Sequence, residues 1–178
     1  LCKLNEPVEI DDSVAVLVLN EDDSFPATGV NLEVMGLGAL ASGEFGPEYL
    51  HEVTVPVVSN EQCNVGYGGQ ITDIMLCAGF PESGGKDPCQ GDSGGPLTVW
   101  DLGNKRTIVY GIASFTYQNC EDHGYPGVFV RVNKFIDWIE KRMKSKCGLF
   151  IFNRYLIMHE AHLFGRNILI NLLSATII

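Results

Sequence analysis

The chain has 178 residues, of which 46% are hydrophobic and 20 are glycine, and its formal net charge at pH 7 is −10. A chain of this length forms one ordinary domain or part of a larger protein, and its apolar content is enough for a buried core. The 22 acidic and 12 basic residues argue against nucleic acid and anionic membrane surfaces as partners. Six cysteines, an even number, favour an oxidising compartment.

The N-terminal region is predicted to contain one strand and a connector. Residues Leu1–Val8 are expected to form a short strand that ends at a proline turn. Residues 10–28 contain an acidic cluster at positions 21–23 and are interpreted as a connector. This cluster is interpreted as a solvated surface, because it lacks the spaced ligands and the tight glycine of a calcium loop.

Four later segments have the alternating or β-branched pattern of strands, namely 30–40, 49–60, 107–116 and 125–132. The first ends in Gly36-Leu37-Gly38, which indicates a close approach of another group to the backbone. Asn133 is predicted to cap a helix that begins at Lys134, since apolar residues recur there at helical spacing. His51 is interpreted as structural, because a catalytic histidine needs a nucleophile and an orienting acid beside it.

The most informative segment is residues 85–96, Gly-Lys-Asp-Pro-Cys-Gln-Gly-Asp-Ser-Gly-Gly-Pro. It places the hydroxyl of Ser93 in a glycine-rich turn, where the backbone can bend sharply. The N–H groups of Gly91 and Ser93 can converge on one point, which is the geometry that an oxyanion hole requires. A serine hydroxyl becomes an effective nucleophile only when a base accepts its proton.

This segment resembles the nucleophile segment of the trypsin-like (chymotrypsin-fold) serine proteases. Residues 126–132 are similar to the Pro-Gly-Val-Tyr-x-Arg-Val strand of that family, and Ser114-Phe115-Thr116 is similar to its Ser-Trp-Gly. The resemblance implies an all-β fold, namely the second six-stranded antiparallel Greek-key barrel of the two-barrel trypsin-like fold, followed by a C-terminal helix. It covers only the C-terminal half of that family.

The expected organisation has four parts. Residues 1–28 are a remnant of the first barrel and the connector between barrels, 29–133 the C-terminal barrel, 134–147 the C-terminal helix and 148–178 an apolar tail unlike the family. The triad histidine and aspartate of the family lie upstream of this sequence, so the N-terminal barrel is expected to be missing. The chain begins at Leu1 without a signal-peptide pattern, and it is therefore interpreted as a fragment, a processed product or an incomplete gene model.

The resemblance assigns the substrate-binding residues. Asp87 is expected at the floor of the primary specificity pocket, where a carboxylate selects Lys or Arg side chains. Gly127 lines that pocket, and the strand through Ser114 pairs with an extended substrate. Two residues depart from the family: Pro88 removes an N–H and a hydroxyl from the pocket wall, and Thr116 replaces a glycine and should crowd the pocket entrance.

The resemblance also assigns Asp92 and four cysteines. Asp92 is expected to pair with the N-terminal ammonium of the activated enzyme, and without that partner to turn toward solvent and leave the oxyanion hole unformed. The family pairing links Cys63 with Cys77 and Cys89 with Cys120. Zinc is not expected, because paired Cys-x-x-Cys spacing is lacking.

The tail, residues 148–178, is interpreted as a mis-predicted gene end, with a membrane-surface helix as the alternative. Its longest uncharged stretch has 12 residues, fewer than the ~20 that a membrane helix needs. His159-Glu160-Ala161-His162 is one residue short of a metalloprotease motif and is interpreted as a coincidence. Cys2 and Cys147 pair with each other, or Cys147 belongs to an artefactual tail.

The predicted function is serine-type endopeptidase activity after Lys or Arg on protein or peptide substrates, with Ser93 as the nucleophile and no metal or cofactor. The chain alone, without the triad histidine and aspartate, is expected to be inactive. The alternatives are a catalytically inactive, protease-like binding module and, from the tail alone, a membrane-anchored protease. Secretion is expected from the disulfides and from the family.

Overall fold

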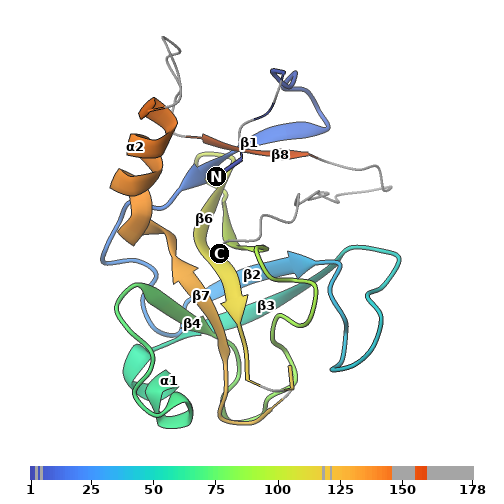
Figure 1. Ribbon diagram of the computed structural model, residues 1–178, viewed down its shortest axis with the longest axis vertical. Coiled ribbons are helices and arrows are strands. Elements are labelled where there is room, and N and C mark those ends of the chain that lie inside the picture. The colour runs from blue at the N-terminus through green and yellow to red at the C-terminus, as the bar shows by residue number, and fades with distance from the viewer. Residues whose placement is uncertain (3, 5, 118, 121, 146–154, 160–178) are drawn as a thin grey trace.

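The computed structural model describes residues 1–2, 4, 6–117, 119–120, 122–145 and 155–159. Within this part of the chain the structure is mostly β-sheet, with helices on one side (Figure 1). The elements, in chain order, are β1 (Val14–Leu19), β2 (Asn31–Gly36), β3 (His51–Val58), α1 (Asn60–Tyr67), β4 (Met75–Ala78), β5 (Pro96–Asp101), β6 (Arg106–Phe115), β7 (Gly127–Arg131), the 3-10 helix η1 (Val132–Phe135), α2 (Ile136–Ser145) and β8 (Tyr155–His159).

Six of these strands close into a barrel. They pair in the order β5-β2-β3-β4-β7-β6, and β6 pairs with β5 to complete the ring. Every pair in the ring is antiparallel. The predicted all-β class, with a six-stranded antiparallel barrel and a C-terminal helix, is confirmed.

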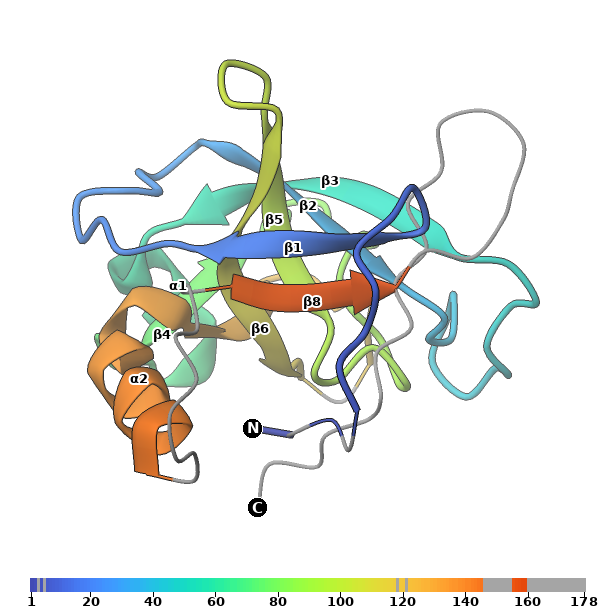
Figure 2. The ribbon, with the colours of Figure 1, turned by 90° about the horizontal axis from the view of Figure 1, so that it is seen from above.

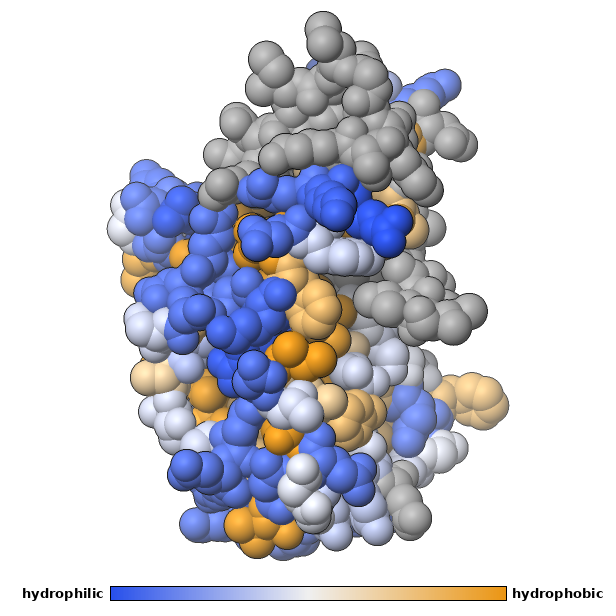
Figure 3. All heavy atoms as spheres, turned by 60° about the vertical axis from the view of Figure 1, so that its left-hand side comes forward, coloured by the Kyte–Doolittle hydropathy of each residue, from blue (hydrophilic) through white to orange (hydrophobic). Residues whose placement is uncertain are grey.

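The barrel interior is filled by apolar side chains that come from successive strands around the ring. Because side chains alternate between the two faces of a strand, every second residue of an amphipathic strand can point inward. The fully buried side chains include Leu32, Val55, Leu76, Leu97 and Phe129. Outside the core, polar side chains cover most of the face shown in Figure 3, with apolar side chains exposed between them.

Two strands lie outside the closed ring. β1 runs parallel to β6 through the pairs Val18–Ile108 and Leu19–Val109, and β8 pairs antiparallel with β1 (Figure 2). Residues 14–19, within the segment interpreted as a connector, thus form a strand. This apolar run finds a strand edge on β6, and pairing there satisfies its backbone hydrogen bonds.

The structure also corrects the N-terminal and C-terminal expectations. The described residues of Leu1–Val8 form no strand, since they pair with no described neighbour and Leu1 and Leu4 are exposed. The alternative interpretation of the tail as a membrane-surface helix is wrong for residues 155–159, because these residues form the strand β8. The remaining tail residues, including His162 and Cys147, lie outside the described residues.

The C-terminal helix begins differently from the prediction. Residues 132–135 form η1, and the α-helical geometry starts at Ile136. Asn133 is not the cap, because its side-chain amide instead donates to the Asp22 carbonyl at 3.1 Å and to Asp23 Oδ1 at 2.8 Å. These bonds attach the acidic loop to the start of the C-terminal helices. No helix among the described residues is long and apolar enough to span a membrane.

Candidate active site

The loop that carries Ser93 consists of two successive hydrogen-bonded turns. The Cys89 carbonyl accepts from the Asp92 N–H at 3.0 Å, and the Asp92 carbonyl accepts from the Gly95 N–H at 2.8 Å. Gly91 and Gly94 have φ angles of 102° and 85°, a region that favours glycine. The Ser93 side chain is thereby exposed at the tip of the second turn.

Strand β6 fixes this loop to the barrel. The Gly94 N–H donates to the Ala113 carbonyl at 2.8 Å, and the Ala113 N–H donates to the Gly95 carbonyl at 2.7 Å. Gly95 has no room for a side chain, because a Cβ there would lie 2.7 Å from the Asp92 carbonyl oxygen. Among the described residues, the N–H groups of Gly91 and Ser93 have no hydrogen-bond partner. These two donors therefore stay free for an added group.

The Asp92 side chain does not turn outward, contrary to the expectation from the sequence. Its carboxylate accepts from the Gly38 N–H at 2.8 Å and from the Cys89 N–H at 3.0 Å, and the residue is partly buried. Two backbone donors thus compensate this charge, as hydrogen bonds to a carboxylate do. The close approach predicted from Gly36-Leu37-Gly38 is present, since a Cβ on Gly36 or Gly38 would collide with this carboxylate.

Asp87 lies partly buried against β7, with few groups to stabilise its charge. One carboxylate oxygen accepts from the Gly127 N–H at 3.3 Å, and the same oxygen lies close to Gly79, where a Cβ would collide with it. Burial raises the pKa of Asp87 to about 7 from 3.8, and the bond from Gly127 only partly offsets this. Pro88 packs so closely on Gly127 that a Cβ there would lie 2.7 Å from the proline ring.

The end of β6 lies beside an aromatic cluster near Asp87. The Tyr67 ring contacts the rings of Phe115 and Tyr125 edge-on, with centroid distances of 5.8 and 5.4 Å. Burial raises the pKa of Tyr67 to about 12, and the negative charge of Asp87 adds to this shift. The Thr116 hydroxyl oxygen is buried close to the Tyr67 phenol. It forms no hydrogen bond with any described residue.

The structure brings only part of the expected site together. Asp87 and Gly127 are in contact, and Gly91 and Ser93 share one loop, which is hydrogen-bonded to Ala113, the residue before Ser114 in β6. Neither His51 nor His123 is hydrogen-bonded to Ser93; the His123 ring lies 3.2 Å from the Glu82 carbonyl oxygen. Among the side chains that the structure describes, no histidine is therefore hydrogen-bonded to Ser93.

Sequence reasoning did not single out Gly79 and Tyr67. Gly79 directly follows β4 and has a φ of 146°. A glycine directly after a buried strand was the sequence signal that could have indicated this position. The Tyr67 hydroxyl donates to the Pro126 carbonyl at 2.9 Å, a contact across 59 residues that no local pattern indicates.

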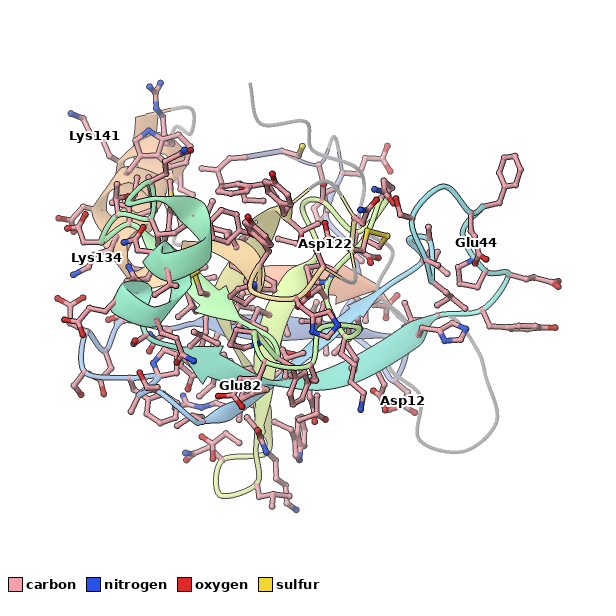
Figure 4. The ribbon with its side chains drawn as sticks, turned by 90° about the horizontal axis from the view of Figure 1, so that it is seen from below. Asp12, Glu44, Glu82, Asp122, Lys134 and Lys141 are labelled. Atoms are coloured by element: carbon pink, nitrogen blue, oxygen red, sulfur yellow. A yellow bond between two sulfur atoms is a disulfide. The ribbon has the colours of Figure 1, made fainter. Side chains whose placement is uncertain are left out.

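Two disulfides hold the loops around this site. Cys63 is bonded to Cys77, and Cys89 is bonded to Cys120. Cys2 is exposed and forms no disulfide with a described residue, and Cys147, its expected partner, lies outside the described residues. No group of three or more potential metal ligands occurs among the described residues. The acidic residues at positions 21–23 are exposed and, through Asp22 and Asp23, contact Asn133 and Lys134 (Figure 4 shows Lys134).

Comparison with known proteins identifies the same family. The family model described as Trypsin matches residues 1–139. Trypsin-1 of Astacus astacus is 45% identical over 141 residues, which cover 79% of this chain and 57% of the crayfish protein. Anionic trypsin of Canis lupus familiaris is 39% identical over 145 residues, covering 82% and 55%.

A longer relative shows a similar degree of identity. Serine proteinase stubble of Drosophila melanogaster is 41% identical over 149 residues, covering 81% of this chain and 18% of the fly protein. The chain spans about half the length of most of the curated relatives named above. The matched residues include the barrel, the two disulfides and the loop of Ser93. Because the family model matches residues 1–139 and the barrel has the expected topology, the chain belongs to the trypsin family of serine proteases.

Proposed function

We propose that Ser93 is the nucleophile of a serine endopeptidase that cuts protein or peptide chains after Lys or Arg. The observation that carries this proposal is the loop geometry: an exposed hydroxyl at the tip of a glycine turn, beside two backbone N–H donors that no described residue occupies. Such a turn can present a nucleophile and stabilise the oxyanion that forms when it attacks a carbonyl. Family membership supports the same chemistry.

In the proposed reaction, Ser93 Oγ attacks the scissile carbonyl carbon while a base accepts the hydroxyl proton. The negative charge on the carbonyl oxygen is stabilised by the N–H groups of Gly91 and Ser93. The scissile C–N bond then breaks as the protonated base donates its proton to the leaving amine, which leaves an acyl group on Ser93 Oγ. In the second half of the reaction the base accepts a proton from water, the resulting hydroxide attacks the acyl carbon, and the base returns the proton to Ser93 Oγ as the ester bond breaks. We propose that a histidine and an orienting aspartate from an N-terminal barrel supply this base, and that the present chain alone is inactive. The lack of a hydrogen bond between Ser93 and either His51 or His123 supports this proposal.

Asp87 is the proposed determinant of specificity. An ammonium or guanidinium group next to its carboxylate would relieve the cost of burying the negative charge, a cost that the raised pKa of about 7 reflects. We propose that Ser114 pairs with the substrate backbone, that Gly127 leaves room for the basic side chain and that Thr116 narrows the entrance. The burial of Asp87 against Gly127 and Gly79 supports this assignment.

We retain the division of the chain as part of the proposal: 1–28 as first-barrel remnant and connector, 29–133 as barrel, 134–147 as helix and 148–178 as tail. The barrel strands β2 to β7 lie between residues 31 and 131, which supports the central boundary. An extracellular location is proposed because two disulfides stabilise the barrel.

Labelling with a serine-directed phosphonate and hydrolysis of a Lys or Arg peptide amide test this function. The complete protein, with both barrels, is expected to label at Ser93, and Ser93→Ala should lower kcat at least about a thousandfold. Ser42→Ala, an exposed serine in another loop, is the matched control. The isolated 178-residue chain should not label. Labelling of this chain would contradict its proposed inactivity, and a complete protein that neither labels nor hydrolyses would favour the inactive binding module.

A further inference from the structure

Basic residues are distributed very unevenly along the chain. Residues 4–85 contain no Lys or Arg, and only five basic residues lie between positions 4 and 139. A protease that cuts after basic residues can therefore act at five bonds in this region, after Lys86, Lys105, Arg106, Arg131 and Lys134. These five peptide bonds differ in the contacts that hold the residues on either side of them.

Arg131 and Lys134 are bound within the fold. Arg131 lies in β7, and its guanidinium donates to the Met75 carbonyl at 3.1 Å. Lys134 lies in η1 and forms a 2.8 Å ion pair with Asp23. A protease cleft accepts an extended segment, so these two bonds can be cut only after β7 or η1 has opened.

Lys86 is exposed, but the residues that follow it are held in place. The Asp87 carboxylate accepts from the Gly127 N–H, and Cys89 is covalently bonded to Cys120. Pro88 between them is buried. An extended conformation on both sides of this bond would require these contacts to break.

Lys105 lies in the turn of the β5–β6 hairpin, which projects from the barrel (Figure 2), and Arg106 is the first residue of β6. Both side chains are exposed, and Lys105 has a φ of 51°, which is uncommon for a residue with a side chain. The turn is held mainly by Asp101, whose carboxylate accepts from the N–H groups of Gly103 at 3.1 Å and Asn104 at 3.2 Å and forms a 3.3 Å ion pair with Arg106. Opening this turn and the adjoining ladder pairs Asp101–Arg106 and Trp100–Thr107 breaks contacts only within the hairpin, whereas Arg131 and Lys134 are held by residues more than 50 positions away.

We propose that the Lys105-Arg106 hairpin tip is a processing site for proteases that cut after basic residues, and that the product is a two-chain protein. Cys89 precedes the site and Cys120 follows it, so their disulfide joins the two chains after the cut. In the cut, water adds across one peptide bond, leaving a carboxylate on Lys105 or Arg106 and an amine on the next residue. The ladder from Pro96 to Val99 of β5 stays paired with β6.

The test uses the purified chain carrying Ser93→Ala and an added Lys/Arg-specific protease, so the result does not depend on the proposed function. The first cut between residues 4 and 139 is expected after Lys105 or Arg106, as identified by fragment mass. Electrophoresis should show one band of full size without reductant and two bands with reductant. Cuts after residue 139 are recognised by mass and do not affect this comparison.

Two variants test why the β5–β6 hairpin is cut before the other sites. Lys105→Gln combined with Arg106→Gln should abolish the early cut. Asp101→Ala should accelerate the early cut about tenfold, because cleavage follows the population of the opened turn. Asp22→Ala removes a comparable turn-capping acid from another loop and should leave the rate unchanged. A first cut at Lys86, no cut in this region, separation of the fragments without reductant, or equal rates for Asp101→Ala and Asp22→Ala would each overturn the proposal.

Discussion

Asp87 has a carboxyl group in surroundings that disfavour its negative charge. Burial raises its pKa in the folded protein to about 7, above the 3.8 of a solvated carboxyl. The folded state therefore binds this proton more tightly than the unfolded state does, and ionisation disfavours folding. The contribution of Asp87 to the free energy of unfolding should fall as pH rises from about 4 to 7, and change little above pH 7.

Asp87→Asn removes this pH dependence. At pH 8 the variant is expected to be more stable than the parent chain by up to about 4 kcal/mol, and the difference should vanish toward pH 4. Urea unfolding at pH 4, 6 and 8 measures this, with Asp12→Asn, an exposed acid, as the control. If the difference between parent and Asp87→Asn is the same at all three pH values, the carboxyl does not titrate as described.

Gly38 is required because the Asp92 carboxylate occupies the space of a side chain. Gly38→Ala is expected to lower the free energy of unfolding by about 1–3 kcal/mol, the usual cost of overpacking, because the carboxylate or the backbone must move. In the matched control Gly103→Ala, the nearest atom lies at an ordinary contact distance of 3.4 Å, and the change should stay within about 0.5 kcal/mol. Equal stability of the two variants, measured by urea unfolding, would show that the Asp92 carboxylate is not held there.

At the scale of elements, the short helix α1 is connected to the strand region beside Asp87. Ser59 caps the helix by accepting from the Gln62 N–H at 3.1 Å, and the Cys63–Cys77 disulfide bonds the helix to β4. The Tyr67 hydroxyl reaches Pro126, immediately before β7. The disulfide and this hydrogen bond thus hold α1 on the barrel, and the Ser59 cap stabilises the helix itself.

Tyr67→Phe tests the last of these contacts. Loss of the hydroxyl leaves the buried Pro126 carbonyl without this donor, and the expected cost is about 1 kcal/mol. Thermal unfolding of Tyr67→Phe is compared with Tyr49→Phe, since Tyr49 is 58% exposed and forms no hydrogen bond with described residues. A loss no larger than that of Tyr49→Phe would mean that the carbonyl finds another donor.

At the scale of the whole molecule, the charge is strongly asymmetric. Residues 4–85 contain fourteen acidic and no basic residues, whereas the remainder of the chain has eight acidic and twelve basic residues. In space, Lys134 and Lys141 lie at the α2 end, and Glu44 lies at the opposite end (Figure 4). A large negative potential of this kind attracts cationic molecules over distances of about a Debye length.

If the proposed function is correct, this field should accelerate the capture of basic substrates. For the complete enzyme, kcat/KM for a peptide with several Lys residues should fall about three- to tenfold between about 0.01 and 0.15 M salt. A peptide with one Arg at the cleavage position and otherwise uncharged residues should show a smaller decrease. Equal salt dependence of the two peptides would show that only the contact with Asp87 responds to salt.

Strands were predicted correctly where the alternating sequence pattern matches the core against which the strand packs. Alternation in 49–60 and 107–116 identified β3 and β6, because each strand places one face in the same apolar core. β4 has only four residues, and its pattern is too short to recognise. β1 was missed because an apolar run of six residues becomes a strand only when an edge, here that of β6, is available to it.

The sequence by itself determined the position of the Ser93 hydroxyl in a glycine-rich turn and the family resemblance, which implied the β-barrel, because motifs and turn glycines are local properties of the chain. Only the tertiary structure decided that the Asp92 carboxylate lies against Gly38 and that Asp87 is buried beside Gly127. Each of these contacts joins residues 40 or more positions apart. The orientation of a charged side chain depends on donors and burial that the folded barrel provides, and residue type and spacing along the chain do not contain that information.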